Sequence, residues 1–211
     1  MNTRDRILDA AADVMRTRGF ARATTKEIAR AAGYSEPMIY KHFANKSRLF
    51  LAVLHERLEA FGPLAAELTR APGERPPRDW LVATAGAAIA FYLESFPMSA
   101  SMFADPDLLA AHRADMADAG AGPHRPVTAV AAYLQAEQDR GRISAAADCS
   151  AAADLLIGAC FQYAFLCCFA GRQPTQGEID TQAASAVGTL LAGIGNAAME
   201  EGAAISEGAA D

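Results

Sequence analysis

Apolar residues recur at helical spacing along the whole chain. In 3–18 they form one stripe, with Arg and Asp residues on the opposite face: Ile7, Leu8, Ala11, Ala12, Val14 and Met15. The same spacing predicts helices over 25–32, from Ser35 onward, and over 46–61, 80–96, 127–140, 147–170 and 178–199, with one or two short helices in 98–119. No segment alternates apolar and polar residues as a strand does. The sequence therefore predicts an all-α protein of about nine helices.

Capping signals mark two short helices near the N-terminus. Thr24 followed by Glu27 has the spacing of a capping box, and Gly33 lies where a left-handed residue would end the helix. Ser35 is placed to cap the next helix, so Pro37 falls in the first turn, where its missing N–H costs nothing. The proline therefore predicts a helix start.

Similar signals set the neighbouring boundaries. We expect Thr3 to cap the first helix and Gly19 to end it. Asn45 is expected to cap the helix over 46–61, which should end or kink at Gly62-Pro63. Pro97 is expected to stop the helix over 80–96.

Two short helices joined by a glycine turn after a longer helix are typical of a helix-turn-helix, whose second helix enters the major groove of DNA. One side of each helix is apolar. We expect Ile28, Ala32, Ile39 and Phe43 to bury against Ile7, Val14 and Phe20.

Charge is distributed unevenly along the chain. The net charge of −6 argues against nucleic acid at first sight. Residues 1–50, however, hold ten Lys or Arg and five acidic residues, a balance of +5, which leaves −11 for the remainder. A basic head on an acidic body suggests that the head meets a polyanion.

The segment TTKEIARAAGYSEPMIYKHFANKSRLF (24–50) closely resembles the tetracycline-repressor (TetR) family of transcriptional regulators. The resemblance implies a DNA-binding domain over 1–47 and an effector-binding and dimerisation domain over 48–211, with a flexible tail over 200–211. It assigns the groove-facing positions to Ser35, Glu36, Pro37, Met38 and Tyr40. It assigns contacts to DNA phosphates to Thr25, Tyr40, His42 and Lys46.

Physical chemistry supports some of these assignments and limits others. Lys46 lies at a helix N-terminus, where backbone N–H groups and the helix dipole also favour a phosphate. Glu36 and Pro37 offer no donor fork for a purine, so direct base readout is expected to be sparse. Glu36 can accept from a cytosine amine and Met38 can contact a thymine methyl. An ordinary solvated face remains the alternative for any one of these residues.

The last two expected helices suit a dimer interface. No charged residue occurs in 155–171 or in 181–199, and small residues are dense there, which lets helices approach closely. A membrane hairpin is disfavoured because Gln162, Gln182 and Asn196, among other polar residues, interrupt the apolar runs. The resemblance implies a homodimer through helices 147–170 and 178–199, bound to a palindromic operator in double-stranded DNA.

The middle of the chain, 78–140, with the inner face of 150–170, is expected to enclose an effector pocket. The candidate lining residues are mostly aromatic or methionine: Phe91, Tyr92, Phe96, Met98, Met102, Phe103, Tyr133, Phe161, Gln162 and Phe165. Such a set favours a small hydrophobic or aromatic effector. The alternative is that these residues form plain core.

Other classes of function find less support. Cys160, Cys167 and Cys168 raise the alternative of a redox-responsive regulator, but buried thiols acting as small apolar residues are favoured. The four histidines and four cysteines have no spacing typical of a metal site, so neither a metal nor a cofactor is expected. No nucleophile motif indicates an enzyme. A helical adaptor that does not bind DNA remains open. The N-terminus has no signal-peptide pattern, and we expect a cytoplasmic protein.

Overall fold

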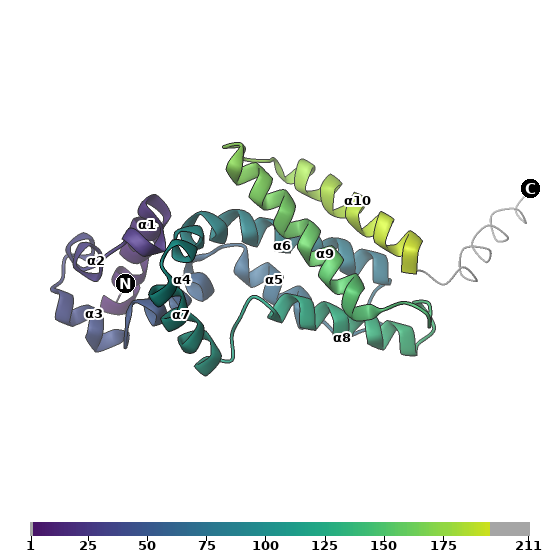
Figure 1. The fold of residues 1–211 in the computed structure, drawn as a ribbon, viewed down its shortest axis with the longest axis horizontal. Coiled ribbons are helices and arrows are strands. Elements are labelled where there is room, and N and C mark those ends of the chain that lie inside the picture. Colours follow the sequence, from purple (N-terminus) through teal and green to yellow (C-terminus); the bar gives the residue numbers. More distant parts are fainter. Residues whose placement is uncertain (1, 195–211) are drawn as a thin grey trace, which may run out of the picture. The chain divides into compact units, whose positions relative to one another are not determined.

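The computed structural model describes residues 2–194, which form ten α-helices and one short 3-10 helix (Figure 1). The helices are α1 (Thr3–Arg22), α2 (Thr25–Ala32), α3 (Glu36–His42), α4 (Lys46–Arg57), α5 (Phe61–Leu68), α6 (Pro77–Ser99), η1 (Ala100–Ala104), α7 (Pro106–Asp118), α8 (Arg125–Asp139), α9 (Cys149–Phe169) and α10 (Gln176–Ile194). The all-α prediction is confirmed. The expected end of the last helix and the expected tail over 200–211 lie outside the described residues.

The caps of the first helices follow the sequence signals closely. Thr24 and Glu27 form the capping box of α2, in which the Thr24 hydroxyl accepts from the Glu27 N–H at 3.1 Å. Gly33 ends α2 with φ +77°. Asn45 caps α4 by accepting from the Arg48 N–H at 2.8 Å. Ser35 occupies the expected cap position of α3, although its hydroxyl makes no capping hydrogen bond.

The start of α1 differs from the prediction. Asn2, not Thr3, is the cap, because the Asn2 side chain accepts from the Asp5 N–H while the Asp5 carboxylate accepts from the Asn2 N–H. Gly19 breaks the helical path as expected, with φ +73°, although helical turns continue to Arg22.

Two prolines do not end helices where expected. Helix α4 ends at Arg57, and Gly62-Pro63 lies in the first turn of α5, where a proline is tolerated. Pro97 lies inside α6. The chain stays helical past Pro97 because the next residue, Met98, is packed in the core and is only 1% exposed. Tertiary packing here outweighs the local cost of the proline.

The chain divides into two compact units. Within the described residues, the first takes in 2–63, Ala90–Gly122 and Ala164–Arg172, and the second Leu64–Ile89, Pro123–Tyr163 and 173–194. Helix α4 belongs to the core of the first unit together with α1. The expected domain boundary after residue 47 stays a prediction.

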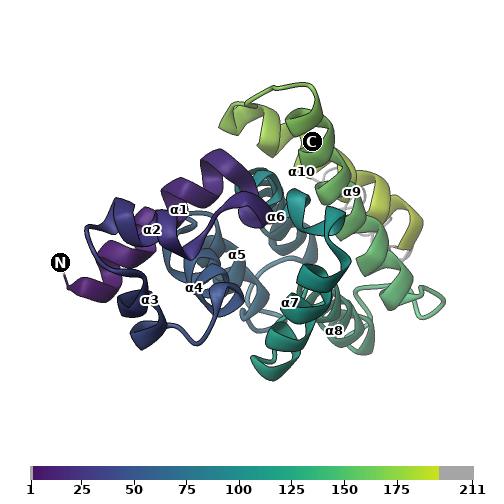
Figure 2. The same cartoon turned by 60° about the vertical axis from the view of Figure 1, so that its left-hand side comes forward.

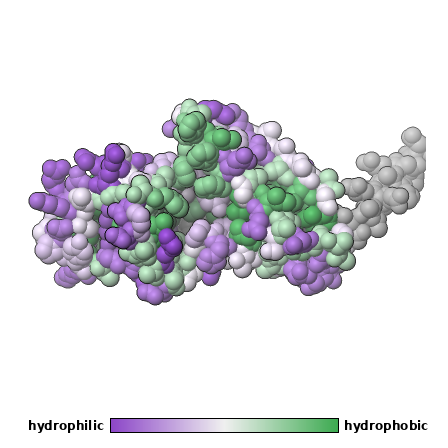
Figure 3. All heavy atoms as spheres, in the orientation of Figure 1, coloured by the Kyte–Doolittle hydropathy of each residue, from purple (hydrophilic) through white to green (hydrophobic). Residues whose placement is uncertain are grey.

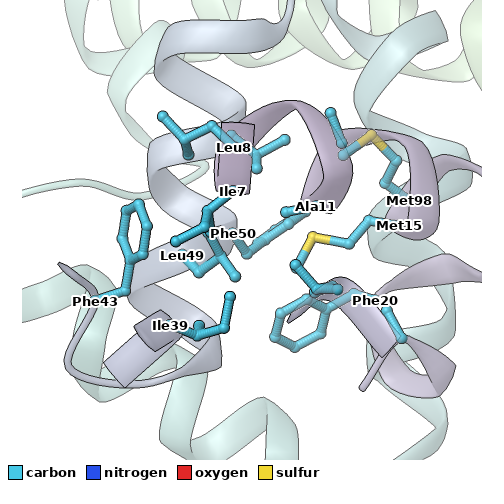
Figure 4. Packing of buried hydrophobic residues seen from close by; sticks show 14 of the residues in the cluster. Ile7, Leu8, Ala11, Met15, Phe20, Ile39, Phe43, Leu49, Phe50 and Met98 are labelled. Atoms are coloured by element: carbon cyan, nitrogen blue, oxygen red, sulfur yellow. The ribbon is translucent and has the colours of Figure 1, made fainter. Parts of the chain in front are cut away.

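The core of the first unit is built around α1 (Figure 4). Ile7, Leu8 and Met15 point toward Leu49 and Phe50 of α4, and all are at most 1% exposed. Val14 is half-buried against this cluster. The other six residues expected to pack in the helix-turn-helix are buried, which confirms the prediction for them: Ile7, Phe20, Ile28, Ala32, Ile39 and Phe43.

The second unit is organised around a pair of aromatic rings. Trp80 of α6 stacks on Tyr133 of α8, with ring centroids 3.6 Å apart, and the Trp80 indole N–H donates to the Glu67 carbonyl at 3.0 Å. One helical turn after Tyr133, the fully buried Glu137 pairs with Arg142 and accepts from a backbone N–H of the 69–76 loop at 3.0 Å. This carboxylate joins α8 to the segments on both sides of it.

Two stretches are long and apolar enough to cross a membrane by length and composition: Pro77–Ala104 and α9. Core helices of globular proteins pass the same test. Near the end of the first stretch, Met98 and Met102 are buried in the core of the first unit.

Candidate nucleic-acid interface

Helix α3 is held by one side and exposed on the other (Figure 2). Ile39 is fully buried, and Phe43, which follows the helix, is 6% exposed. The opposite side carries exposed residues at Ser35, Pro37, Tyr40 and His42, and Tyr40 is 51% exposed. The remaining expected groove positions, Glu36 and Met38, are half-buried. The structure thus presents α3 as a recognition helix would require.

A hydrogen-bonded chain joins α2 to the exposed side of α3. The Thr25 hydroxyl donates to the Glu36 carboxylate at 2.5 Å and lies 3.2 Å from the Tyr40 hydroxyl. Since the single Thr25 proton is used by Glu36, Tyr40 donates to Thr25. The three groups fix one another's rotamers. They also place one negative charge beside two groups expected to contact phosphates.

Lys46 is not free in solvent. Its Nζ donates to the Ala21 carbonyl at 3.2 Å and lies 4.5 Å from the centroid of the Phe20 ring. Burial lowers the pKa of the Lys46 ammonium, an effect that Asp105 partly offsets. The charge is therefore held at the junction of α1 and α4, close to the start of α2.

Helix α4 is clamped to α1. Arg4 donates to both oxygens of Glu56, at 2.7 and 2.6 Å, a bidentate geometry that favours a strong pair. Arg57 donates to Asp9 at 2.7 Å and to Asp5 at 3.1 Å. These bonds raise the pKa of Arg57 and make α1 and α4 one rigid piece.

Helix α7 docks on the start of α4 in the same unit. Asp115 accepts from the Asn45 amide at 3.1 Å and pairs with Arg48 at 3.4 Å. One turn earlier, His112 is 5% exposed and its ring lies 5.7 Å from Phe20 and 5.5 Å from Phe50. The His112 Nδ1 has no hydrogen-bond partner among the described residues, and burial lowers the pKa of the ring.

The residues expected to line an effector pocket are divided between the two units. Met98 and Met102 belong to the core around α1, and Tyr133 stacks on Trp80 in the second unit. Phe103 is 71% exposed. Three of the expected lining residues lie at exposed positions of α9: Phe161, Gln162 and Phe165. The half-buried residues are Phe91, Tyr92 and Phe96. That these residues bind an effector stays a prediction.

The cysteines are poorly suited to redox sensing. Cys160 and Cys167 are each 2% exposed, and burial raises the pKa of the Cys160 thiol to about 12. Because the thiolate is the reactive form, such a thiol is inert. Cys168 is half-buried, and burial raises its pKa as well.

Sequence reasoning missed the contacts that hold the interface residues. The spacing of Glu36 and Tyr40, four residues apart, predicts that they share a face of α3. Their partner Thr25 comes from another helix, and the Ala21 carbonyl that accepts from Lys46 carries no side-chain signal at all.

Helices α2 and α3, joined by the Gly33 turn and packed on α1, with one side of α3 exposed in a basic N-terminal region, define a helix-turn-helix DNA-binding protein. The sequence comparisons identify the family. Residues 7–53 match the bacterial regulatory proteins of the tetR family, and residues 99–193 match the C-terminal domain of AefR-like transcriptional repressors. The chain belongs to the TetR family of transcriptional regulators, a class of DNA-binding proteins rather than enzymes.

Curated relatives match about a quarter of the chain. The chain is 43% identical over 56 residues to the transcriptional activator FasR of Mycolicibacterium smegmatis, and 44% identical over 54 residues to the regulator YvkB of Bacillus subtilis. Each match covers 26% of this chain. It covers 26% of FasR and 29% of YvkB, so the chain spans about a quarter of the length of these relatives.

Solved structures match the fold over nearly the whole chain. A TetR-family regulator from Mesorhizobium loti has a TM-score of 0.67 at 22% identity, with 92% of this chain and 97% of that chain covered. The complex of SmeT with triclosan has a TM-score of 0.65 at 22% identity, with 93% of each chain covered. FadR of Bacillus subtilis in complex with stearoyl-CoA has a TM-score of 0.64 at 15% identity, with 90% and 98% covered.

Proposed function

We propose that this regulator is a dimeric repressor that binds a palindromic operator and leaves it when a small hydrophobic or aromatic effector binds. The observation that carries the DNA-binding part is the exposed side of α3, where Tyr40 is fixed to Thr25 and Glu36. A rigid constellation loses little conformational entropy on binding. Phosphate contacts from Thr25, Tyr40, His42 and Lys46 would then position α3 in the groove.

Removing one hydroxyl tests this assignment. Tyr40→Phe keeps the ring and deletes the hydroxyl, whose proton would turn from Thr25 to a phosphate in the complex. A hydrogen bond to a charged group is worth about 1.5–3 kcal/mol, so affinity for operator DNA should fall roughly 10- to 150-fold. Tyr34→Phe is the matched control, because Tyr34 is half-buried in the same head and its hydroxyl contacts Arg6 and Thr3. Equal affinities for the two variants, measured by fluorescence anisotropy, would reject Tyr40 as a contact.

The dimer is supported by an apolar surface on α9. Large hydrophobic residues are exposed along this helix, among them Phe165 at 39%, Leu166 at 52% and Phe169 at 83%. Figure 3 shows hydrophobic atoms at the top of the view, over the end of α9 that leads to α10. Such surfaces on a monomer mark a contact with another chain. A second copy of α9 and α10, forming a four-helix interface, is the occupant that the symmetry of a palindrome favours.

A matched pair of exposed phenylalanines tests the dimer surface. Phe169→Glu should convert the dimer to a monomer in light scattering, because a carboxylate would be buried without a partner. Phe103→Glu is the control, since Phe103 is 71% exposed on η1, outside α9 and α10. A dimer that survives Phe169→Glu, or that is lost equally in both variants, would refute the α9 interface.

The effector part rests on the aromatic residues at the end of α6. Phe91 and Tyr92 have ring centroids 5.6 Å apart, and Phe96 meets Phe165 edge to face, also at 5.6 Å. SmeT and FadR, which share this fold, are solved in complex with triclosan and with stearoyl-CoA, respectively. A redox-responsive regulator is disfavoured by the raised pKa of Cys160, and DNA affinity that is unchanged by peroxide would exclude it.

Release from DNA requires two poses with different effector affinity. Since α4 is clamped to α1, an effector that changes the pose of α4 moves the whole head. Triclosan serves as the probe of a hydrophobic or aromatic effector: it should weaken operator binding by the dimer and raise its melting temperature. Release by strongly charged ligands alone would contradict a hydrophobic effector.

A further inference from the structure

The first unit contains a basic hollow that the recognition helix does not form. Its volume is about 570 Å³, and it lies between the end of α1 and the segment from Pro97 to Ala104. Three arginines line it, Arg16, Arg18 and Arg22, and no acidic residue does. The rest of the lining is small, uncharged residues. The hollow therefore offers positive charge without a built-in carboxylate.

The three arginines are available to a ligand to different degrees. Arg16 pairs with Asp13 and Arg18 with Glu27, each at 3.1 Å, and both guanidinium groups are more than half exposed. Exposed pairs of this kind contribute only about 0–1 kcal/mol, so a phosphate can displace the carboxylate at little cost. Arg22 is exposed and has no hydrogen bond or ion pair within the described residues. Arg22 is thus the principal candidate to bind an anion.

The backbone that carries Arg22 is held in place. The Ser101 hydroxyl accepts from the Ala21 N–H at 3.1 Å, and Gly19 is close enough to Ser101 that no side chain fits between them. The Ala21 carbonyl accepts from Lys46. The backbone of Arg22 is therefore fixed before binding, so that only its side chain loses conformational entropy on binding.

The position of the hollow indicates which anion it meets. Ala21 lines the hollow and touches Lys46, and Thr25 follows Arg22 by three residues. Arg22 thus lies along the chain between the residue that holds Lys46 and Thr25, and both Lys46 and Thr25 are expected to contact DNA phosphates. The lining is open to solvent, as a backbone contact requires, and arginine suits phosphate through its fork of N–H donors.

We propose that Arg22, supported by Arg16 and Arg18, binds a phosphate of the DNA backbone, so that the DNA contact extends from α3 and the start of α2 to the end of α1. The inference rests on the DNA-binding function of the head. It assigns Arg22 to affinity and positioning, not to base recognition.

The salt dependence of DNA binding tests the proposal. Each phosphate neutralised contributes about 0.9 to the slope of log affinity against log salt, so Arg22→Ala should lower the slope by about 0.9. It should weaken specific and random duplex by the same factor, whereas Arg22→Lys should keep most of the slope. The variant Arg16→Ala/Arg18→Ala/Arg22→Ala should lower the slope further. Arg125→Ala in the second unit is the control for loss of one exposed positive charge, and its slope should equal that of the wild type.

Three results would overturn the proposal. Wild-type slopes in both Arg22→Ala and the triple variant, with unchanged circular dichroism, would show that the hollow does not meet DNA. A loss confined to one operator sequence would show base reading instead. Inorganic pyrophosphate could instead stabilise the wild type but not the triple variant, while the salt slopes of DNA binding stay unchanged. That result would make the hollow a site for a small anion. Failure of the wild type to bind any duplex would instead refute the DNA-binding function itself.

Discussion

Gly19 makes a contact that a single methyl group should disrupt. Its φ is +73°, and a Cβ added there would lie 2.7 Å from the Ser101 Oγ and 3.2 Å from the Ser101 Cβ. Gly19→Ala therefore carries two costs. With ψ +161° this backbone lies in a region essentially restricted to glycine, and holding an alanine there costs about 1–3 kcal/mol. Displacing Ser101 costs about 1 kcal/mol more if its hydrogen bond to the Ala21 N–H is lost.

A glycine without this contact serves as the comparison. Gly120 has φ +60° and nothing within 4 Å of an added Cβ, so Gly120→Ala carries a left-handed backbone cost of about 1–2 kcal/mol and no clash. Gly19→Ala should cost about 2–4 kcal/mol. Urea unfolding followed by far-UV circular dichroism measures both, because the single tryptophan, Trp80, reports on the second unit only.

A double-mutant cycle isolates the clash. Ser101→Ala alone should cost about 1 kcal/mol for the lost hydrogen bond. In Gly19→Ala/Ser101→Ala the added Cβ no longer meets an oxygen, so the double variant should be less destabilised than the sum of the single variants by about 1 kcal/mol. Strict additivity would refute the packing of α1 against η1 at Ser101.

Three further predictions concern buried groups. Glu137→Gln removes the charge that balances Arg142 and should lower the free energy of unfolding in urea by about 3 kcal/mol. A loss of only about 0–1 kcal/mol, as for exposed ion pairs, would contradict a buried pair. His112 has a lowered pKa in the folded state, so its contribution to stability is complete above its ordinary value of 6.5 and is lost as the pH falls from there through the lowered pKa. The wild type should therefore lose more stability than His112→Leu between about pH 7.5 and about pH 5, and parallel curves would contradict this. In the native protein, iodoacetamide should label Cys160 more slowly than Cys168 in peptide mass spectrometry, and equal labelling would contradict the burial of Cys160.

The sequence predicted those parts of the fold that depend on local chemistry. The capping box of Thr24 and Glu27, the left-handed Gly33 and the Asn45 cap each satisfy backbone groups within one helical turn, so their spacing is visible in the sequence. Pro97 failed as a boundary because burial of Met98, a tertiary effect, keeps the chain helical.

The candidate site residues come from the family motif and stay a prediction, whereas the contacts that connect them have no signal in the sequence. Tyr40 and Lys46 follow from the family motif, and their exposure or position at a helix start agrees with it. The hydrogen bond from Thr25 to Glu36 joins two helices. The basic hollow joins the end of α1 to the segment from Pro97 to Ala104, which lies far away in the sequence. Neither has a periodic signal, because both depend on how separate helices pack.

Selection of DNA fragments by the purified protein tests the central claim most directly. Fragments from the protein's own genome are bound at two salt concentrations with random duplex as competitor, and the retained fragments are sequenced. We expect enrichment of a palindrome whose half-sites lie about one DNA turn, roughly 34 Å, or a multiple of it apart, with binding that weakens steeply with salt and is lost in Tyr40→Ala. Retention no better than that of random duplex at either salt would contradict a dimeric operator-binding regulator.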